Sequence, residues 1–143
     1  MIPRVTKAMK IFISTALAAV LLAGCQTAPN REAQRVLTAD EARRLFVGNT
    51  VESFNLNTSF TSFTYYHPNG QAMQERLWVR RIGTWSIQAD GKICLAFGKR
   101  KAKCRHLVSD GGRYFKILAD EKGDISKIVR YRYFAEGNAL AER

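Results

Sequence analysis

Residues 83–104 read GTWSIQADGKICLAFGKRKAKC, and the expected fold follows from the turns and alternations inside this segment. In its first part Gly83, Trp85 and Ile87 are separated by polar residues. Two glycine-containing turns then interrupt the pattern, at Asp90-Gly91 and at Gly98-Lys99-Arg100. Period-two alternation broken by such turns is typical of antiparallel β-hairpins. The segment therefore predicts an antiparallel meander with strands near 83–88, 92–97 and 102–108.

The two cysteines of this segment are expected to form a disulfide bond, since both would lie on one side of the second hairpin. A three-residue loop over 98–100 predicts three opposed pairs: Phe97 with Lys101, Leu95 with Lys103, and Cys94 with Cys104. A cross-link over these eleven residues would stabilise the domain by roughly 2.7 kcal/mol in the loop-entropy model. The alternatives are a redox dithiol or a metal site with His106, which need closer spacing or more ligands. Counting free thiols with and without reductant tests the pairing.

The same alternation continues on both sides of this segment. Turn signals at 67–70, 110–112 and 122–124 separate further expected strands near 51–56, 60–66, 71–81, 113–118 and 125–134. In the last of these strands Val129, Tyr131 and Tyr133 alternate with Arg130 and Arg132, so the arginines are expected to face outward. Thr38-Ala39-Asp40-Glu41 has the form of a capping box and predicts one short helix over 39–47.

The expected fold is mainly β: an antiparallel meander forming a strongly curved sheet or small barrel of roughly seven to eight strands, with one short N-terminal helix. The helix would cover an open edge or plug an end of the barrel. An α+β half-barrel is the alternative. Candidate interior residues are Phe63, Tyr65, Trp85 and Tyr131. Whether they fill the interior or line a cavity stays open.

Residues 1–24 have the form of a bacterial lipoprotein signal peptide. Lone positive charges at Arg4, Lys7 and Lys10 precede an apolar run over 11–22 that is too short for a stable transmembrane helix. Small residues then precede Cys25, where a lipobox places the lipidated cysteine. Three acyl chains would make desorption from a membrane negligible. A plain secreted protein is the alternative.

The rest of the chain is expected to divide into a tether and one small domain. Residues 25–36 would be the lipidated cysteine and its tether, 37–138 a single β-rich domain, and 139–143 a tail. Gln26 after the cysteine favours sorting to the outer membrane, with the domain facing the periplasm. A start at Met9 would leave a shorter signal of the same design.

The chain beyond Cys25 is basic, with 20 Lys and Arg against 12 Asp and Glu and a net charge of +8. An exported domain of this charge meets phospholipid, lipopolysaccharide and peptidoglycan rather than nucleic acid. These anionic components, an envelope protein and the membrane itself are the expected partners. The densest charge lies in one hairpin, at Lys99, Arg100, Lys101, Lys103 and Arg105. It is a candidate surface for anionic ligands, and a solvated hairpin tip is the alternative.

Catalysis is not expected. His67 and His106 are the histidines of the chain, and neither accompanies a recognisable nucleophile and acid. No cofactor or metal site is expected either. Gly83-Thr84-Trp85 matches the short Gly-x-Trp element of lipocalin-like barrels, although lipocalins carry it on their first strand.

Several motifs occur together in a familiar order. They are Leu37-Thr38-Ala39-Asp40-Glu41, Gly48-Asn49-Thr50-Val51, Tyr66-His67-Pro68-Asn69-Gly70, Gly83-Thr84-Trp85-Ser86-Ile87, Asp90-Gly91-Lys92-Ile93-Cys94-Leu95, Lys103-Cys104-Arg105, Asp110-Gly111-Gly112-Arg113-Tyr114, Lys122-Gly123 and Gly137-Asn138. Over about 37–138 the chain resembles a family of small exported Gram-negative bacterial proteins classed as a domain of unknown function. The resemblance implies the same domain boundary and cysteine pairing, and no catalytic or binding residues.

One loop carries a second similarity. Residues 109–114, Ser-Asp-Gly-Gly-Arg-Tyr, are similar to the Ser-Gly-x-x-Tyr loop of the membrane-bound lipoprotein inhibitors of lysozyme. Those proteins present the loop to a strongly basic enzyme, which would repel a domain of net charge +8.

These observations predict a non-enzymatic lipoprotein that acts as a binding or envelope-organising module. The alternatives are a lipocalin-like carrier of an apolar ligand and an inhibitor of a cell-wall hydrolase such as lysozyme. A cavity of several hundred Å³ lined by Phe63, Trp85 and Tyr131 would favour the carrier, and a filled core would favour a surface-binding module.

Overall fold

The structure is a computed structural model that describes residues 34–141. The predicted signal peptide and Cys25 lie outside the described residues. Eleven elements follow one another along the chain: β1 (Arg35–Val36), α1 (Ala39–Phe46), β2 (Asn49–Asn55), β3 (Thr61–Tyr66), β4 (Gln71–Arg76), β5 (Val79–Ile87), β6 (Ile93–Phe97), β7 (Lys103–Arg105), β8 (Leu107–Asp110), β9 (Arg113–Ala119) and β10 (Ile125–Glu136). Within the described part, no helix has the length and apolar character needed to cross a membrane.

The strands form one sheet in which every neighbouring pair is antiparallel. Their order is β1-β8-β9-β10-β2-β3-β4-β5-β6-β7. This architecture confirms the mainly β fold with one short helix. The sheet has ten strands rather than the seven to eight expected. The expected strand over 71–81 is divided by a turn at Leu77-Trp78, and the expected strand over 102–108 is interrupted at His106.

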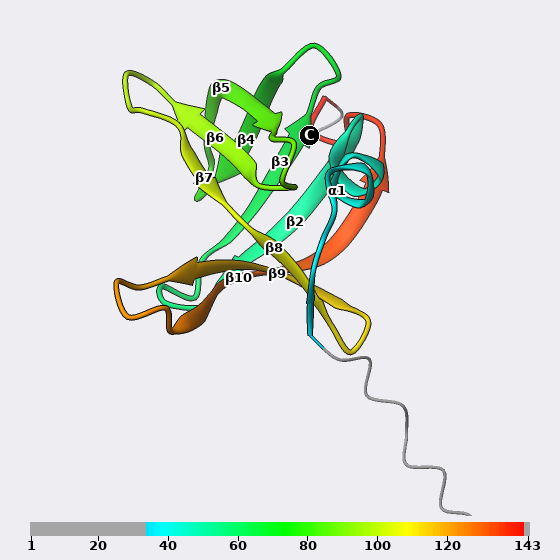
Figure 1. Cartoon of the computed structure of the whole chain (residues 1–143). Helices are drawn as coiled ribbons and strands as arrows, with labels where there is room; N and C mark the ends of the chain where they lie inside the picture. The colour runs from blue at the N-terminus through cyan, green and yellow to red at the C-terminus, as the bar shows by residue number, and fades with distance from the viewer. Residues whose placement is uncertain (1–33, 142–143) are drawn as a thin grey trace, which may run out of the picture.

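The sheet curls into a half-barrel because β7 and β8, which are consecutive in the chain, lie at or next to its opposite ends. β7 pairs with β6, and β8 pairs with β9. Along the chain, a single residue, His106, separates β7 from β8. Because β7 and β8 follow one another directly, β6 and β9, which are far apart in the strand order, pair with neighbouring parts of one continuous segment. Figure 1 shows the resulting curvature, with α1 at one end and the β2–β3, β6–β7 and β9–β10 connections at the other.

Helix α1 begins at the expected capping box. The Thr38 hydroxyl accepts a hydrogen bond from the Glu41 amide at 3.3 Å, and the Glu41 carboxylate accepts one from the Thr38 amide at 2.9 Å. The helix ends at Phe46, one residue earlier than predicted. Its buried residues, Ala42 and Phe46, share the face that packs against the sheet. The Phe46 ring lies 5.0 Å from the Tyr66 ring and 5.1 Å from the Tyr131 ring, so α1 closes one end of the half-barrel.

Two expectations about side-chain direction are wrong. A β-bulge between Tyr131 and Tyr133 inserts an extra residue, so Tyr133 points outward, 61 % exposed, and Phe134 packs inward against Phe46. In β3 the buried residues are Thr64 and Tyr66, which places Phe63 and Tyr65 on the outer face. A shift of one residue in register exchanges the two faces of a strand, and aromatic composition does not set that register.

The domain also extends beyond both predicted ends. Arg35 and Val36, expected in the tether, form β1 against β8. Leu140, expected in the tail, is fully buried, and its carbonyl accepts a hydrogen bond from Arg80 at 2.8 Å. The pairing and burial of these flanking residues make them part of the folded domain.

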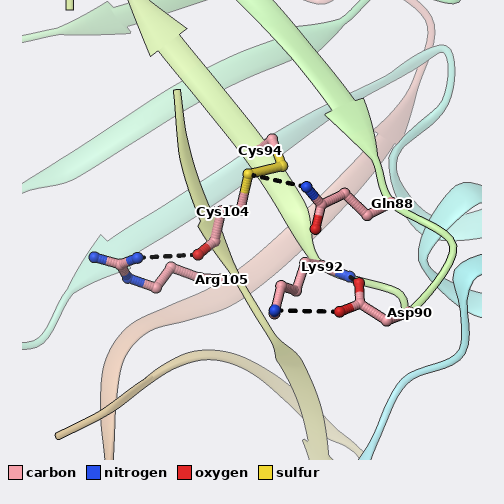
Figure 2. The surroundings of a disulfide bond; sticks show 6 residues. All are labelled: Gln88, Asp90, Lys92, Cys94, Cys104 and Arg105. Carbon is pink, nitrogen blue, oxygen red and sulfur yellow. Dashed lines mark hydrogen bonds and ion pairs between the residues drawn. A yellow bond between two sulfur atoms is a disulfide. The ribbon is translucent and has the colours of Figure 1, made fainter. Parts of the chain in front are cut away.

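The cysteine pairing agrees with the expected register. Leu95 lies opposite Lys103, Cys94 lies opposite Cys104, and a disulfide bond joins the two sulfurs (Figure 2). The expected Phe97–Lys101 pair does not form, so the loop between the strands is longer than three residues. Because neighbouring residues of a strand face opposite sides, the disulfide lies on the face away from Leu95 and Lys103. The Gln88 amide group donates to the Cys104 sulfur at 3.5 Å on that face.

Candidate anion-binding cavity

The inner face of the half-barrel lines a partly open cavity of about 370 Å³. Tyr66 and Tyr131 form its floor, since their rings contact Phe46 of α1 on one side and line the cavity on the other. Residues of the β2–β3 and β6–β7 connections line its opposite end, which is the end away from α1. The barrel is therefore plugged by the helix at one end and hollow at the other.

The lining of the cavity combines apolar and cationic side chains. Its aromatic and aliphatic members are Phe60, Tyr66, Leu95, Phe97, Ile128, Val129 and Tyr131. Its cationic members are Arg76, Arg81, Arg100, Lys101, Lys103, Arg105 and Lys116. Within the part of the chain that the structure describes, no Asp or Glu lines the cavity, and none of these seven cations forms an ion pair with a carboxylate. The cavity is thus strongly positive and carries no internal compensation.

Four of the five cations predicted from the basic hairpin lie in this cavity: Arg100, Lys101, Lys103 and Arg105. Lys103 and Arg105 point inward because they lie opposite Leu95 and Ile93, on the inner face of the β6–β7 pair. Lys99 does not line the cavity. The mixed apolar and basic face expected for this hairpin is therefore the inner wall of the barrel rather than an outer surface.

Arg81, which lines the cavity, is held in place by a chain of buried polar groups. The Thr64 hydroxyl accepts a hydrogen bond from the Gln74 amide at 3.1 Å, and the Gln74 carbonyl oxygen accepts one from the Arg81 Nε at 2.9 Å. The guanidinium also lies over the Phe97 ring, 4.3 Å from its centroid. Desolvation lowers the pKa of Arg81, and nearby Arg76 and Arg100 lower it further. This arrangement fixes the direction of one cation while leaving its charge unneutralised.

Lys116 and Tyr131 meet on the β9–β10 side of the cavity. The Lys116 ammonium lies 6.0 Å from the centroid of the Tyr131 ring. Desolvation lowers the pKa of Lys116 to about 8, and the charge of Arg105 contributes in the same direction. The buried Tyr131 hydroxyl has no hydrogen-bond partner among the described residues, and burial raises its pKa. A cation and a free hydroxyl on a desolvated wall are groups that an anion would satisfy.

The other residues predicted for the interior have different positions. Trp85 is buried in the core, where its ring lies 5.1 Å from that of Tyr66 and its Nε1 donates to the His67 carbonyl at 2.9 Å. It does not line the cavity, and neither do the outward-facing Phe63 and Tyr65. Of the predicted interior set, Tyr131 is the member that lines it.

Sequence reasoning missed three of the cavity cations, Arg76, Arg81 and Lys116. For Arg76 and Arg81 a signal was present, because polar residues recur at inward positions of β4 and β5 in place of the apolar ones that a filled core requires. This signal can be recognised only when the turn at Leu77-Trp78 is known, because the turn fixes which residues of β4 and β5 face inward. Within residues 34–141, no cluster of three or more His, Cys, Asp or Glu side chains could hold a metal ion.

The fold is thus a half-barrel closed at one end by α1, with a basic cavity in its interior. No protein-family model and no curated protein matches the chain.

Proposed function

We propose that this chain is a non-enzymatic lipoprotein of the cell envelope, held on the periplasmic face of the outer membrane through Cys25. We propose further that its half-barrel binds an organic anion with an apolar part. The main support for an anionic ligand is the cavity itself, which is lined by seven cations and by no described carboxylate. It favours the carrier hypothesis over a module that binds through its outer surface.

Electrostatics supports an anionic ligand. Like charges about 4 Å apart repel by about 4 kcal/mol each at an effective dielectric constant of about 20. The cations that line the cavity repel one another in this way, since no described acid lies among them to neutralise their charge. A bound anion converts repulsion into charge-assisted hydrogen bonds, each worth about 1.5–3 kcal/mol. The free energy of this change favours binding and selects against cationic ligands.

Size and lining restrict the ligand further. Small-molecule sites span about 300–1,000 Å³, and the cavity of about 370 Å³ lies at the lower end of that range. The cations surround a space that also exposes Phe60, Leu95 and Val129. A short acyl, alkyl or aryl group bearing a phosphate, sulfate or carboxylate matches both features. An uncharged apolar ligand would leave the cations unpaired, so the carrier of a purely apolar molecule is disfavoured.

Binding of hexyl sulfate tests this proposal, with hexyl glucoside as the uncharged ligand of equal chain length. In isothermal titration calorimetry of the full chain in neutral detergent, hexyl sulfate is expected to bind at least tenfold more tightly than the glucoside. Lys103→Gln combined with Arg105→Gln should weaken hexyl sulfate binding by about tenfold or more, because two ligand contacts are lost. Lys99→Gln is the matched control, since Lys99 belongs to the same hairpin but does not line the cavity. Equal weakening in both variants would contradict the proposal.

The pH dependence of the same binding isolates the contribution of Lys116. Hexyl sulfate keeps its charge across neutral and alkaline pH, whereas Lys116, with a pKa of about 8, loses its proton as the pH rises through that value. Affinity is therefore expected to fall between about pH 7 and pH 9. Lys116→Met should bind more weakly at pH 7 and lack this fall. An unchanged pH profile in Lys116→Met would show that another group controls the titration.

A further inference from the structure

The β4–β5 hairpin ends in an exposed apolar tip. Leu77 is 58 % exposed, Trp78 is 99 % exposed and Val79 is 63 % exposed. They are consecutive residues at a two-residue turn, because Arg76 pairs directly with Val79. Contiguous exposed apolar groups mark interaction sites more often than single ones do. None of the three belongs to the buried core.

The backbone of this turn is strained by the residues that occupy it. Leu77 has a φ of 49° and Trp78 a φ of 66°, the left-handed region that two-residue hairpins require at both central positions. Asn and Gly occupy this region most readily, whereas a bulky side chain does so at a conformational cost. Stability of the hairpin would therefore favour Asn-Gly over Leu-Trp. Strained residues cluster where a function requires their side chains.

Arginines surround the apolar tip. Arg76, Arg80 and Arg81 flank it, and residues 76–82 contain no acid. Arg80 forms an ion pair with Glu75 at 3.0 Å and donates a hydrogen bond to the Leu140 carbonyl. Arg76, whose guanidinium lies over the Phe60 ring, lines the cavity together with Arg81. An exposed tryptophan above a basic collar is complementary to an anionic lipid surface, where indole rings favour the interface and arginines bind headgroups.

We infer that the tip formed by Leu77, Trp78 and Val79 inserts into the interfacial layer of a bilayer that contains anionic lipid. Insertion brings part of the cavity lining close to the membrane surface, because Arg76 and Arg81 line the cavity and also flank the tip. A second protein molecule is a poorer occupant, since a standard interface buries about 800 Å² on each partner and a turn of this size offers far less. The inference does not rest on the proposed ligand.

Tryptophan fluorescence tests this insertion, since the chain has two tryptophans with opposite environments. Trp85 is 8 % exposed and serves as an internal reference, whereas Trp78 is 99 % exposed. The full chain is reconstituted in vesicles of phosphatidylethanolamine and phosphatidylglycerol, some with lipids brominated near the headgroup end of their acyl chains. Brominated lipid is expected to quench a large part of the emission, and Trp78→Tyr should remove most of that quenching. Vesicles of neutral phosphatidylcholine should quench less.

A second variant keeps the reporter while weakening insertion. Leu77→Asn combined with Val79→Thr retains Trp78 and suits the turn, because Asn tolerates positive φ and Thr suits a strand. Its quenching by brominated lipid should fall several-fold with the thermal midpoint unchanged or raised. Lys103→Gln combined with Arg105→Gln, which tests the ligand, should leave quenching unchanged. Two results would overturn the inference: emission insensitive to brominated lipid in the native chain, or shielding of Trp78 from iodide that grows with protein concentration without lipid.

Discussion

Replacing Phe46 with alanine is expected to lower the free energy of unfolding by about 3–5 kcal/mol. Phe46 is fully buried, and its ring packs edge-to-face on Tyr66, Tyr131 and Phe134 at centroid distances of 5.0, 5.1 and 5.8 Å. Truncation removes these contacts and leaves a void between α1 and the sheet, which the surrounding strands cannot fill without moving. A domain of this size has about 5–15 kcal/mol in total, so the variant would be close to unfolding at 37 °C.

Urea unfolding followed by circular dichroism measures this loss, and two variants define its origin. Phe46→Leu keeps most of the buried volume and should cost less than half as much. Arg44 lies on the exposed face of the same helix, so Arg44→Ala should change the free energy of unfolding by no more than about 0.5 kcal/mol. A loss below about 1 kcal/mol for Phe46→Ala would show that α1 does not plug the barrel.

Gly83→Ala is the second substitution with a large expected effect, about 3 kcal/mol or more. A Cβ at this position would lie 2.1 Å from the Ala96 carbonyl oxygen and 2.6 Å from Cδ1 of Phe97. The carbonyl belongs to the neighbouring strand β6, so it can move only if the β5–β6 ladder distorts. The Phe97 ring lies over Gly83, and Arg81 stacks on that ring at 4.3 Å. Substitution should therefore weaken hexyl sulfate binding as well as folding.

The neighbouring Thr84→Ala is the control, because Thr84 is exposed on the outer face of the same strand. Urea unfolding should show a change within about 0.5 kcal/mol for this variant, and calorimetry should show unchanged ligand affinity. A Gly83→Ala protein of native stability would mean that β5 and β6 are further apart than the structure places them.

Local features of this chain were predictable from its sequence. The Thr38–Glu41 capping box, the pairing of Cys94 with Cys104 and the burial of Trp85 follow from interactions within a few residues or across one short hairpin. The sequence is misleading where a local pattern is compatible with more than one backbone structure. The turn at Leu77-Trp78 lacks the Asn-Gly signal of a hairpin, so the sequence predicts a continuous strand over 71–81. The β-bulge before Tyr133 has no sequence signature that distinguishes it from continued alternation.

The candidate site was predictable in part. The basic hairpin contained Lys103 and Arg105, and alternation correctly placed them on the face of Leu95. Three further cations, Arg76, Arg81 and Lys116, come from strands β4, β5 and β9, which are separated from the hairpin along the chain. Their convergence depends on how tightly the sheet curls, a property of all the strands together.

The β-rich class of the domain, its capped helix and its disulfide register are all encoded locally, because each depends on hydrogen bonds and alternation over short separations. Tertiary structure decided that the basic face turns inward. The direct succession of β7 and β8 brings β6 and β9 close together, and the side chains on the inner face of the curled sheet leave about 370 Å³ unfilled. Whether an interior is filled or hollow depends on volumes summed over distant strands, so the inward polar residues of β4 and β5 do not determine it by themselves.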